Sequence, residues 1–259
     1  MNKIEIIKGL TEAGFTVKED TIEKNGIKKD IIIIMTNNNI NPTIYPDQFE
    51  KVDDIDEIIE FVKLSILNSL TDNDIKELLS DREYILNNVT IGLAEKGRTS
   101  GKYITFDSEI KGYENYLMVS LTIGKNNGSV TLSENIIKMS GLSLEELKEK
   151  AMVNTIKNAV AFNMESLIPC APSGSGMVVL TNKSQFKGAA SIYAKELIKE
   201  YFPDAEEIVC IPSSIHEWIL MDKANVSDID FVTEMISEVN STQVAPEEIL
   251  GTKPVVLSL

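Results

Sequence analysis

The stretch FTVKEDTIEKNGIKKDIIII, residues 15–34, places two segments rich in β-branched residues on either side of Asn25-Gly26. Asn-Gly is the preferred pair for a type I′ turn, because both central residues of that turn need a positive φ. Two strand-like segments joined by such a pair predict a β-hairpin formed by residues 15–24 and 27–34.

Helices are predicted on both sides of the hairpin. Ile4, Ile7 and Leu10 have helical spacing in a segment that ends near Gly14. After the hairpin, acidic residues at 53–57 open a second helix, where they complement the helix dipole. The apolar stripe of that helix is Ile55, Ile58, Ile59, Val62 and Ile66. The first part of the chain is therefore expected to be a helix–hairpin–helix unit.

The rest of the chain alternates between strand and helix patterns. Residues 84–93 fit either a helix or a strand, and residues 97–102 form the best linker candidate. Beyond it, strands are expected at 116–123, 129–132, 177–180, 208–211 and 217–221, and helices after Ser133 and Ser143 and at 188–202 and 229–239. This order predicts an α+β fold with mixed or antiparallel sheets and packed helices, ending in a ββαββα-like part. The expected division is 1–105 and 106–259, with one domain left open as the alternative to two.

Composition limits the classes of function. The 259 residues include 40 acidic and 25 basic ones, which gives a formal charge of −15. This charge repels a phosphate backbone, so direct nucleic-acid binding is not expected. The longest aliphatic run, residues 31–35, is too short to cross a bilayer, and the charged N-terminus lacks a secretory signal. Cys170 and Cys210 form no C-x-x-C pair, which favours reduced thiols and a cytoplasmic location.

Three short motifs resemble known sites but lack a required residue. Residues 97–102, GRTSGK, have three residues between the glycines where a phosphate-binding loop needs four, and Tyr103 follows the lysine. Asp72-Asn73-Asp74 lacks the glycine and the distal glutamate of a calcium loop. Ser173–Gly176 precedes a strand and so opens no helix to hold a dinucleotide. We therefore expect neither a metal nor a cofactor.

The only histidine, His216, lies in the densest group of polar side chains that enzymes use. Ser213, Ser214 and Glu217 are its neighbours, and Cys210 is close in sequence. A serine or cysteine nucleophile beside a histidine base and a carboxylate is a possible catalytic arrangement. Adjacent strand residues point to opposite faces, however, and no G-x-S-x-G elbow or H-E-x-x-H motif is present. A structural turn with a hydrogen-bonded histidine is the competing interpretation.

The chain resembles a bacterial family known only as a domain of unknown function. The resemblance rests on LTNK at 180–183, PSSIHE at 212–217 and VNSTQVAPEEIL at 239–250, together with PTIY at 42–45, Asn154-Thr155 and Gly188-Ala189-Ala190. It implies no known activity, cofactor or catalytic residue. It does imply that Thr181, Asn182, Ser213, Ser214, His216 and Asn240 share one surface, and Thr181, Asn182 and Asn240 are therefore candidates for ligand or partner binding.

Four functions remain open from the sequence. The leading hypothesis is a non-enzymatic interaction or regulatory factor of a bacterial or mobile-element system, whose partner is another protein. The first alternative is a hydrolase or transferase that uses His216 with Ser213, Ser214 or Cys210 within hydrogen-bonding reach in a concave pocket. The second is an acidic inhibitor of a nucleic-acid-binding protein, which needs one contiguous acidic face. The third is small-ligand binding between the two halves of the chain.

Overall fold

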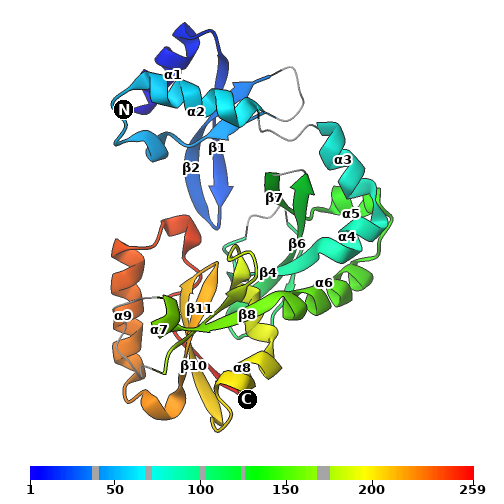
Figure 1. The fold of residues 1–259 in the computed structure, drawn as a ribbon, viewed down its shortest axis with the longest axis vertical. Coiled ribbons are helices and arrows are strands. Elements are labelled where there is room, and N and C mark those ends of the chain that lie inside the picture. The colour runs from blue at the N-terminus through cyan, green and yellow to red at the C-terminus, as the bar shows by residue number, and fades with distance from the viewer. Residues whose placement is uncertain (37–40, 68–71, 100–102, 124–125, 168–175) are drawn as a thin grey trace.

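The computed structural model describes residues 1–36, 41–67, 72–99, 103–123, 126–167 and 176–259. In these residues the helices pack against three sheets, and every strand pair is antiparallel (Figure 1). The predicted α+β fold is confirmed, and antiparallel pairing is the form that the sheets adopt.

The N-terminal part contains the predicted hairpin between two helices. Its elements are α1 (Lys3–Glu12), β1 (Thr16–Lys24), β2 (Ile27–Met35), β3 (Thr43–Ile44), the 3-10 helix η1 (Pro46–Phe49) and α2 (Ile55–Leu67). Lys24 pairs with Ile27, so Asn25 and Gly26 alone form the turn. Their φ angles are 47° and 77°, as a type I′ turn requires.

Only the end of the hairpin nearest the helices belongs to a hydrophobic core. Ile32 and Ile34 of β2 are fully buried against Ile6, Leu10 and helix α2. The tip of the hairpin extends beyond this core toward the C-terminal part (Figure 1). Asn37, Asn38 and Asn39, which the sequence suggests as the end of the second hairpin strand, lie outside the described residues.

The segment that fitted both a helix and a strand contains one of each. Asp81 caps α4 (Arg82–Asn88) by accepting from the backbone of Glu83 and Tyr84, and β4 (Val89–Glu95) follows at once. The helix ends where β-branched residues begin, and the Ile91 N–H donates to the Thr155 hydroxyl (2.9 Å). Upstream lies the helix α3 (Asp72–Ser80).

A four-stranded sheet occupies the middle of the chain. Its strands are β4, β5 (Thr105–Asp107), β6 (Tyr113–Ile123) and β7 (Asn126–Thr131), with β6 pairing with the other three. Helices α5 (Glu134–Ser140) and α6 (Leu144–Asn158) follow. Ser143 begins α6 as predicted, since its side chain accepts from the Glu146 N–H (3.2 Å).

A five-stranded sheet in the order β12-β10-β11-β9-β8 forms the last third. Its strands are β8 (Ala159–Asn163), β9 (Val178–Asn182), β10 (Glu207–Ser214), β11 (Glu217–Asp222) and β12 (Val255–Ser258). The connecting helices are α7 (Met164–Leu167), η2 (Gly188–Tyr193), α8 (Lys195–Tyr201), η3 (Lys223–Asn225), α9 (Ile229–Thr242) and η4 (Pro246–Glu248). Strands β8 and β12 were not expected from the sequence.

The helix predicted at 188–202 is wrong as a single element. Residues Gly188–Tyr193 form the 3-10 helix η2, the chain turns at Ala194, and α8 follows. Every residue of η2 is buried, so its apolar side chains do not mark one face of a longer helix.

Two of the four hydrophobic clusters among the described residues are larger than the others. The smaller of these two uses residues from Met1 to Ile66, and the larger one uses residues from Ile75 to Leu259. The β4–β6 pairs lie on both sides of residue 105, so they link the two predicted halves. The division into 1–105 and 106–259 stays a prediction. No helix among the described residues is both long and apolar enough to cross a membrane.

Candidate functional site

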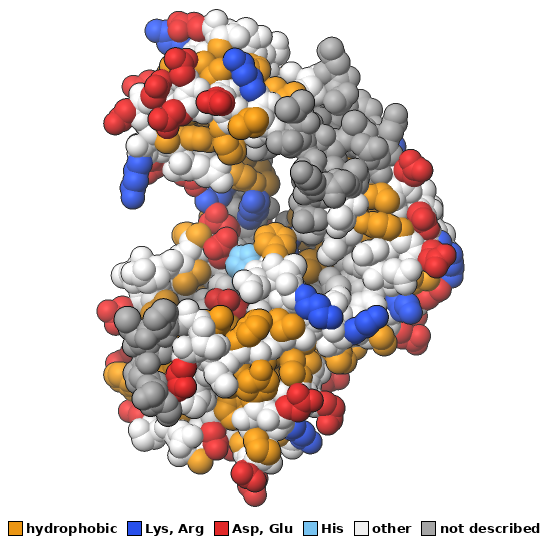
Figure 2. Space-filling model, viewed as in Figure 1, with side chains coloured by type: hydrophobic (Ala, Val, Ile, Leu, Met, Phe, Trp, Pro, Cys, Tyr) orange, Lys and Arg blue, Asp and Glu red, His pale blue; other side chains and the backbone are white. Residues whose placement is uncertain are grey.

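A large cleft lies between the hairpin and the C-terminal part. We call it the hairpin cleft, and its volume is about 1260 Å³. Figure 2 shows the face of the molecule hollowed between these two parts. The lining residues used below are Lys24, Lys29, Tyr45, Thr90, Tyr103, Asn182, Lys183, Phe186, Lys187, Ser191, His216, Glu247 and Glu248. The cleft is where small-ligand binding between two parts of the chain, the third alternative from the sequence, would occur, and that alternative stays a prediction.

His216 lies in the turn between β10 and β11, with its side chain 19% exposed. Its Nδ1 accepts a hydrogen bond from the Lys187 N–H (3.0 Å), and its Nε2 lies 3.5 Å from Glu248 Oε1. Since Nδ1 is an acceptor, the proton of a neutral ring is on Nε2, facing the glutamate. In this arrangement Nδ1 is occupied by a backbone N–H, and Nε2 faces Glu248 rather than a serine or cysteine nucleophile.

The serines proposed as nucleophiles are engaged elsewhere. Ser213 Oγ donates to Glu217 Oε1 (3.1 Å), while Ser214 Oγ accepts from the backbone N–H of His216 (3.1 Å). Cys210 is fully buried, and burial raises its pKa. The structure thus brings Ser214 and His216 together through the backbone, and it places neither hydroxyl in a hydrogen bond with the imidazole. Cys170 lies outside the described residues.

Asn182 organises the loop that covers His216. Its Oδ1 accepts from Ser184 Oγ (2.9 Å) and from the Phe186 N–H (3.2 Å), and its Nδ2 donates to the Phe186 carbonyl (2.9 Å). This loop holds Gln185 and Lys187 at φ angles of 54° and 49°. Such angles in residues other than glycine are uncommon and often found at functional sites. The loop directs the Phe186 ring to 5.3 Å from the His216 ring.

Thr181 forms a hydrogen bond with the backbone of the same turn. It is 2% exposed, and its hydroxyl donates to the His216 carbonyl (2.7 Å). Gly188 packs so closely here that a Cβ would lie 2.6 Å from that carbonyl oxygen and 2.7 Å from Asn182 N. Thr181, Asn182 and His216, which are distant in sequence, therefore form one cluster. Their roles in binding stay predictions.

Asn240 lies apart from this cluster. It is on α9, where its Nδ2 donates to the Gly251 carbonyl (3.0 Å), and it does not line the cleft. This hydrogen bond tethers the segment from η4 to Gly251. The Glu248 carbonyl, at the end of η4, accepts from the Ile215 N–H (2.8 Å). Asn240 therefore reaches the His216 turn only through the segment that it tethers.

The hairpin tip docks on this same segment. Asn25 Nδ2 donates to the carbonyls of Glu247 (3.2 Å) and Ile249 (2.8 Å). Arg98 donates to the carbonyls of Asn25 (3.2 Å) and Pro246 (3.1 Å). Lys29 forms ion pairs with Asp47 (2.7 Å) and Glu247 (2.5 Å). These contacts join the N-terminal part to the C-terminal part at one end of the cleft.

Two lysines in the cleft have no acidic partner among the described residues. Lys24 lies on the hairpin, 4.3 Å from the centre of the Tyr45 ring, and Lys187 lies on the opposite wall. The pKa of Lys187 is lowered, first because the ammonium is buried and second because Lys24 is close. Burial and a like charge both disfavour an ammonium, so this pair favours an anion between the two groups.

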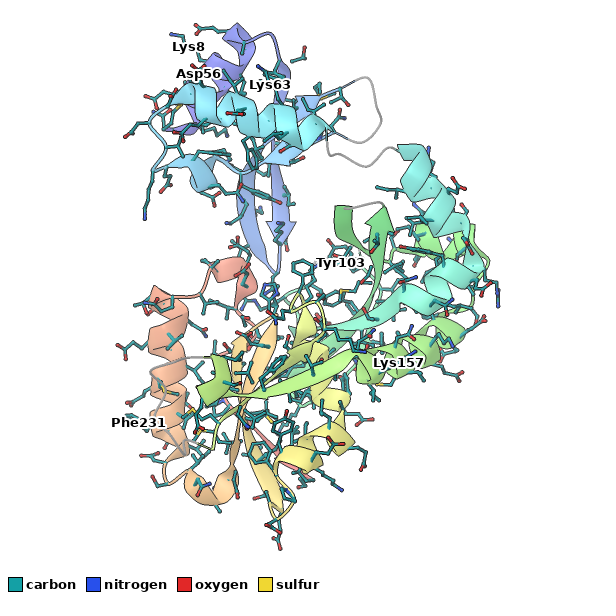
Figure 3. All side chains as sticks on the ribbon, viewed as in Figure 1. Lys8, Asp56, Lys63, Tyr103, Lys157 and Phe231 are labelled. Carbon is teal, nitrogen blue, oxygen red and sulfur yellow. The ribbon has the colours of Figure 1, made fainter. Side chains whose placement is uncertain are left out.

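Buried hydroxyls without partners also line the cleft. Ser191 is 1% exposed, and neither its Oγ nor the Oγ1 of Thr90 has a hydrogen-bond partner in the described structure. Glu247 Oε2 is unpartnered in the same way. Such buried groups are rare in native proteins and need a water or ligand to satisfy them. Figure 3 shows Tyr103 in the region between the hairpin and β6, where its ring is 39% exposed.

Reasoning from the sequence missed Lys24, Lys187 and Ser191. The only signal for Lys24 was its position beside the Asn-Gly turn, which identifies a hairpin tip but not what the tip faces. Among the described residues, no group of three or more His, Cys, Asp and Glu side chains is placed to hold a metal ion.

The cleft with its two lysines is the candidate site on this α+β scaffold. Over residues 3–255 the chain matches the model of DUF5688, a family of unknown function, and it belongs to that family. The resemblance to a domain of unknown function is thus confirmed. No curated protein and no solved structure is significantly similar to this chain.

Proposed function

We propose that the protein is a non-enzymatic binding factor, and that its hairpin cleft holds a ligand with an anionic group and an aromatic ring. The observation that supports this most is the pair formed by Lys24 and Lys187. The two ammonium groups face one cleft in a protein of charge −15 and have no carboxylate partner among the described residues. An anion between them removes both their repulsion and the penalty of burying Lys187.

The surroundings of the lysine pair suit the rest of such a ligand. Phe186 and Tyr103 expose 47% and 39% of their surface, which leaves ring faces available for stacking. The hydroxyls of Ser191 and Thr90 and the Oε2 of Glu247 lie buried without a partner in residues of the cleft wall, where a ligand or a water that entered would satisfy them. A single drug-sized ligand occupies about 300–1,000 Å³, so the cleft has room for a ligand of that size and its water.

A regulatory role follows from where the cleft lies. Both parts of the chain line it, and a ligand that contacts both stabilises the arrangement in which the hairpin tip is docked. We therefore propose an interaction or regulatory factor of a bacterial system that acts in the cytoplasm. The buried thiol of Cys210 is compatible with a reducing compartment.

Phenyl phosphate is a suitable probe, with Trp218 as the reporter. Trp218 is the only tryptophan and is fully buried, and its Nε1–H donates to the Ala189 carbonyl (2.7 Å), two residues from Lys187. Titration should change its emission and give a saturable curve. Lys187→Met and Lys24→Met should each weaken binding about ten- to hundredfold, because each removes a charge-assisted contact of about 1.5–3 kcal/mol. Lys28→Met, at an exposed position of the hairpin, is the matched control.

Two further ligands separate the contributions of charge and ring. Benzyl alcohol has the ring without the charge, and inorganic phosphate has the charge without the ring. Both should bind more weakly than phenyl phosphate. Equal affinity for benzyl alcohol, or lysine variants that bind like Lys28→Met, would show that the lysine pair is not an anion site.

The same probe tests the hydrolase alternative. Steady release of phenol, lost on His216→Ala, would mean that the protein is an enzyme and that our proposal is wrong. We expect no release, since Nδ1 of His216 accepts from the Lys187 N–H, and neither Ser213 nor Ser214 donates its hydroxyl to the ring. The acidic-inhibitor alternative needs one contiguous acidic face, whereas acidic side chains are spread over both parts of the face in Figure 2.

A further inference from the structure

Helix α9 has two apolar stripes, and only one of them is buried. Val232 and Ile236 pack against Val209 and Ile211 of β10. The second stripe, which we call the outer stripe, consists of Phe231, Met235 and Val239, spaced four residues apart. These side chains are 64%, 37% and 41% exposed. Figure 3 shows Phe231 projecting from α9 on the side away from the sheet.

A row of carboxylates borders the outer stripe. Asp230, Glu234 and Glu238 also repeat every four residues, so they form a second line along the same helix. None of the three forms an ion pair with another residue that the structure describes. The sequence from Asp228 to Thr252 contains no lysine or arginine, so α9 has no basic residue to balance this row.

We propose that the outer stripe docks a basic amphipathic segment of a different protein. Apolar side chains of that segment would cover Phe231, Met235 and Val239, and its lysines or arginines would face the carboxylate row. An amphipathic helix that lies with its apolar face on such a surface is a common mode of peptide recognition. Isolated exposed apolar residues are ordinary, but three in one line beside an unbalanced acidic row present apolar surface and charge together.

The same charges exclude a second copy of this chain as the occupant. Two α9 helices packed through their outer stripes would bring two carboxylate rows together without a cation between them. A basic partner instead gains attraction over distance, which speeds its association. This inference does not depend on the hairpin cleft, because no residue of α9 lines the cleft.

A designed peptide tests the surface directly. The probe is a fluorescein-labelled 18-residue amphipathic helix with leucine on one face and lysine on the other, and binding is followed by fluorescence anisotropy on the full chain. Phe231→Ser combined with Met235→Ser should weaken binding at least tenfold. The matched control, Ile4→Ser with Leu64→Ser, removes apolar side chains that are 78% and 52% exposed on α1 and α2. It should bind like the wild type.

Charge reversal provides a second readout that does not remove apolar surface. Glu234→Lys with Glu238→Lys should reject the lysine peptide and bind a peptide in which every lysine is glutamate. Unchanged Trp218 emission would show that the variants are folded. If the Phe231/Met235 variant and the Ile4/Leu64 control bind equally, the peptide is held by net charge alone and the proposal is overturned. Self-association that Phe231→Ser abolishes would overturn it as well.

Discussion

Lys187 combines an uncommon backbone conformation with an unfavourable site for its charge. Its φ is 49°, and its N–H donates to His216 Nδ1, which fixes the loop in this form. The ammonium is buried near Lys24, and both effects lower its pKa. Functional sites often contain residues whose strain the surrounding structure maintains, and we interpret Lys187 in this way.

Stability should depend on pH through Lys187. Its pKa in the folded state is below the unfolded value of 10.5, so the folded chain binds fewer protons there and gains stability as pH rises toward 10.5. Lys187→Met removes this penalty and should raise the melting temperature at pH 7. A gain of about 1 kcal/mol corresponds to roughly 2–4 °C for a chain of this size.

Thermal unfolding of the Lys187→Met variant and the wild type between pH 7 and pH 10 gives the comparison. The difference in melting temperature between the variant and the wild type should shrink as pH increases, because the Lys187 ammonium of the wild type loses its proton. A variant that is less stable than the wild type at pH 7 would contradict the assignment of an unbalanced charge.

At the scale of elements, the hairpin is the structure that connects the two parts of the chain. Its turn follows from Asn25-Gly26, but the contacts of the tip with Arg98 and with residues 246–249 come from segments far away in sequence. Lys29 adds ion pairs to Asp47 and Glu247. Burial opposes a charged ammonium, but the hydrogen bonds that Lys29 donates to these carboxylates outweigh burial and raise its pKa. The hairpin therefore closes one end of the cleft.

Asn25→Gly should loosen this closure without changing the turn. Glycine accepts the positive φ of position 25, whereas the two side-chain hydrogen bonds to Glu247 and Ile249 are lost. At about 1 kcal/mol per bond, the equilibrium for opening should increase about thirtyfold. Hydrogen exchange of the amides in residues 247–250 should accelerate accordingly. Lys28→Ala is the control, and equal exchange in both variants would mean that the tip contact does not hold the segment.

The two largest hydrophobic clusters of the described residues are of unequal size, and the smaller one ends at Ile66 while the larger one begins at Ile75. Buried apolar surface supplies most of the stability of a folded unit, so the smaller N-terminal cluster should be the less stable one. The contacts of the hairpin tip are polar and add comparatively little to this difference.

Unfolding in urea should then occur in two steps. Far-UV circular dichroism reports both parts, while Trp218 emission reports only the larger cluster. We expect the dichroism to begin to change at a lower urea concentration than the emission. Coincident transitions would indicate one cooperative unit and would favour the single-domain alternative.

Local patterns in the sequence determined the fold class, the Asn25-Gly26 hairpin, the cap at Ser143 and the turn at His216, because turns, caps and periodicity depend on residues close together in the chain. Periodicity also predicted one helix where η2 and α8 form two elements. Every residue of Gly188–Tyr193 is buried, so apolar residues there do not mark a buried face opposite an exposed one. Strands β8 and β12 also needed distant partners to be recognised.

Only the tertiary structure decided what surrounds His216. Ser213 donates to Glu217, and Ser214 accepts from the backbone of His216. Lys187 and Glu248, which are distant in sequence, lie next to Nδ1 and Nε2 of the ring. It also brought Lys24 and Lys187 to one cleft across more than 160 residues of chain. Charges interact over a distance that the fold sets, so no spacing or periodicity in the sequence predicts a pair of this kind.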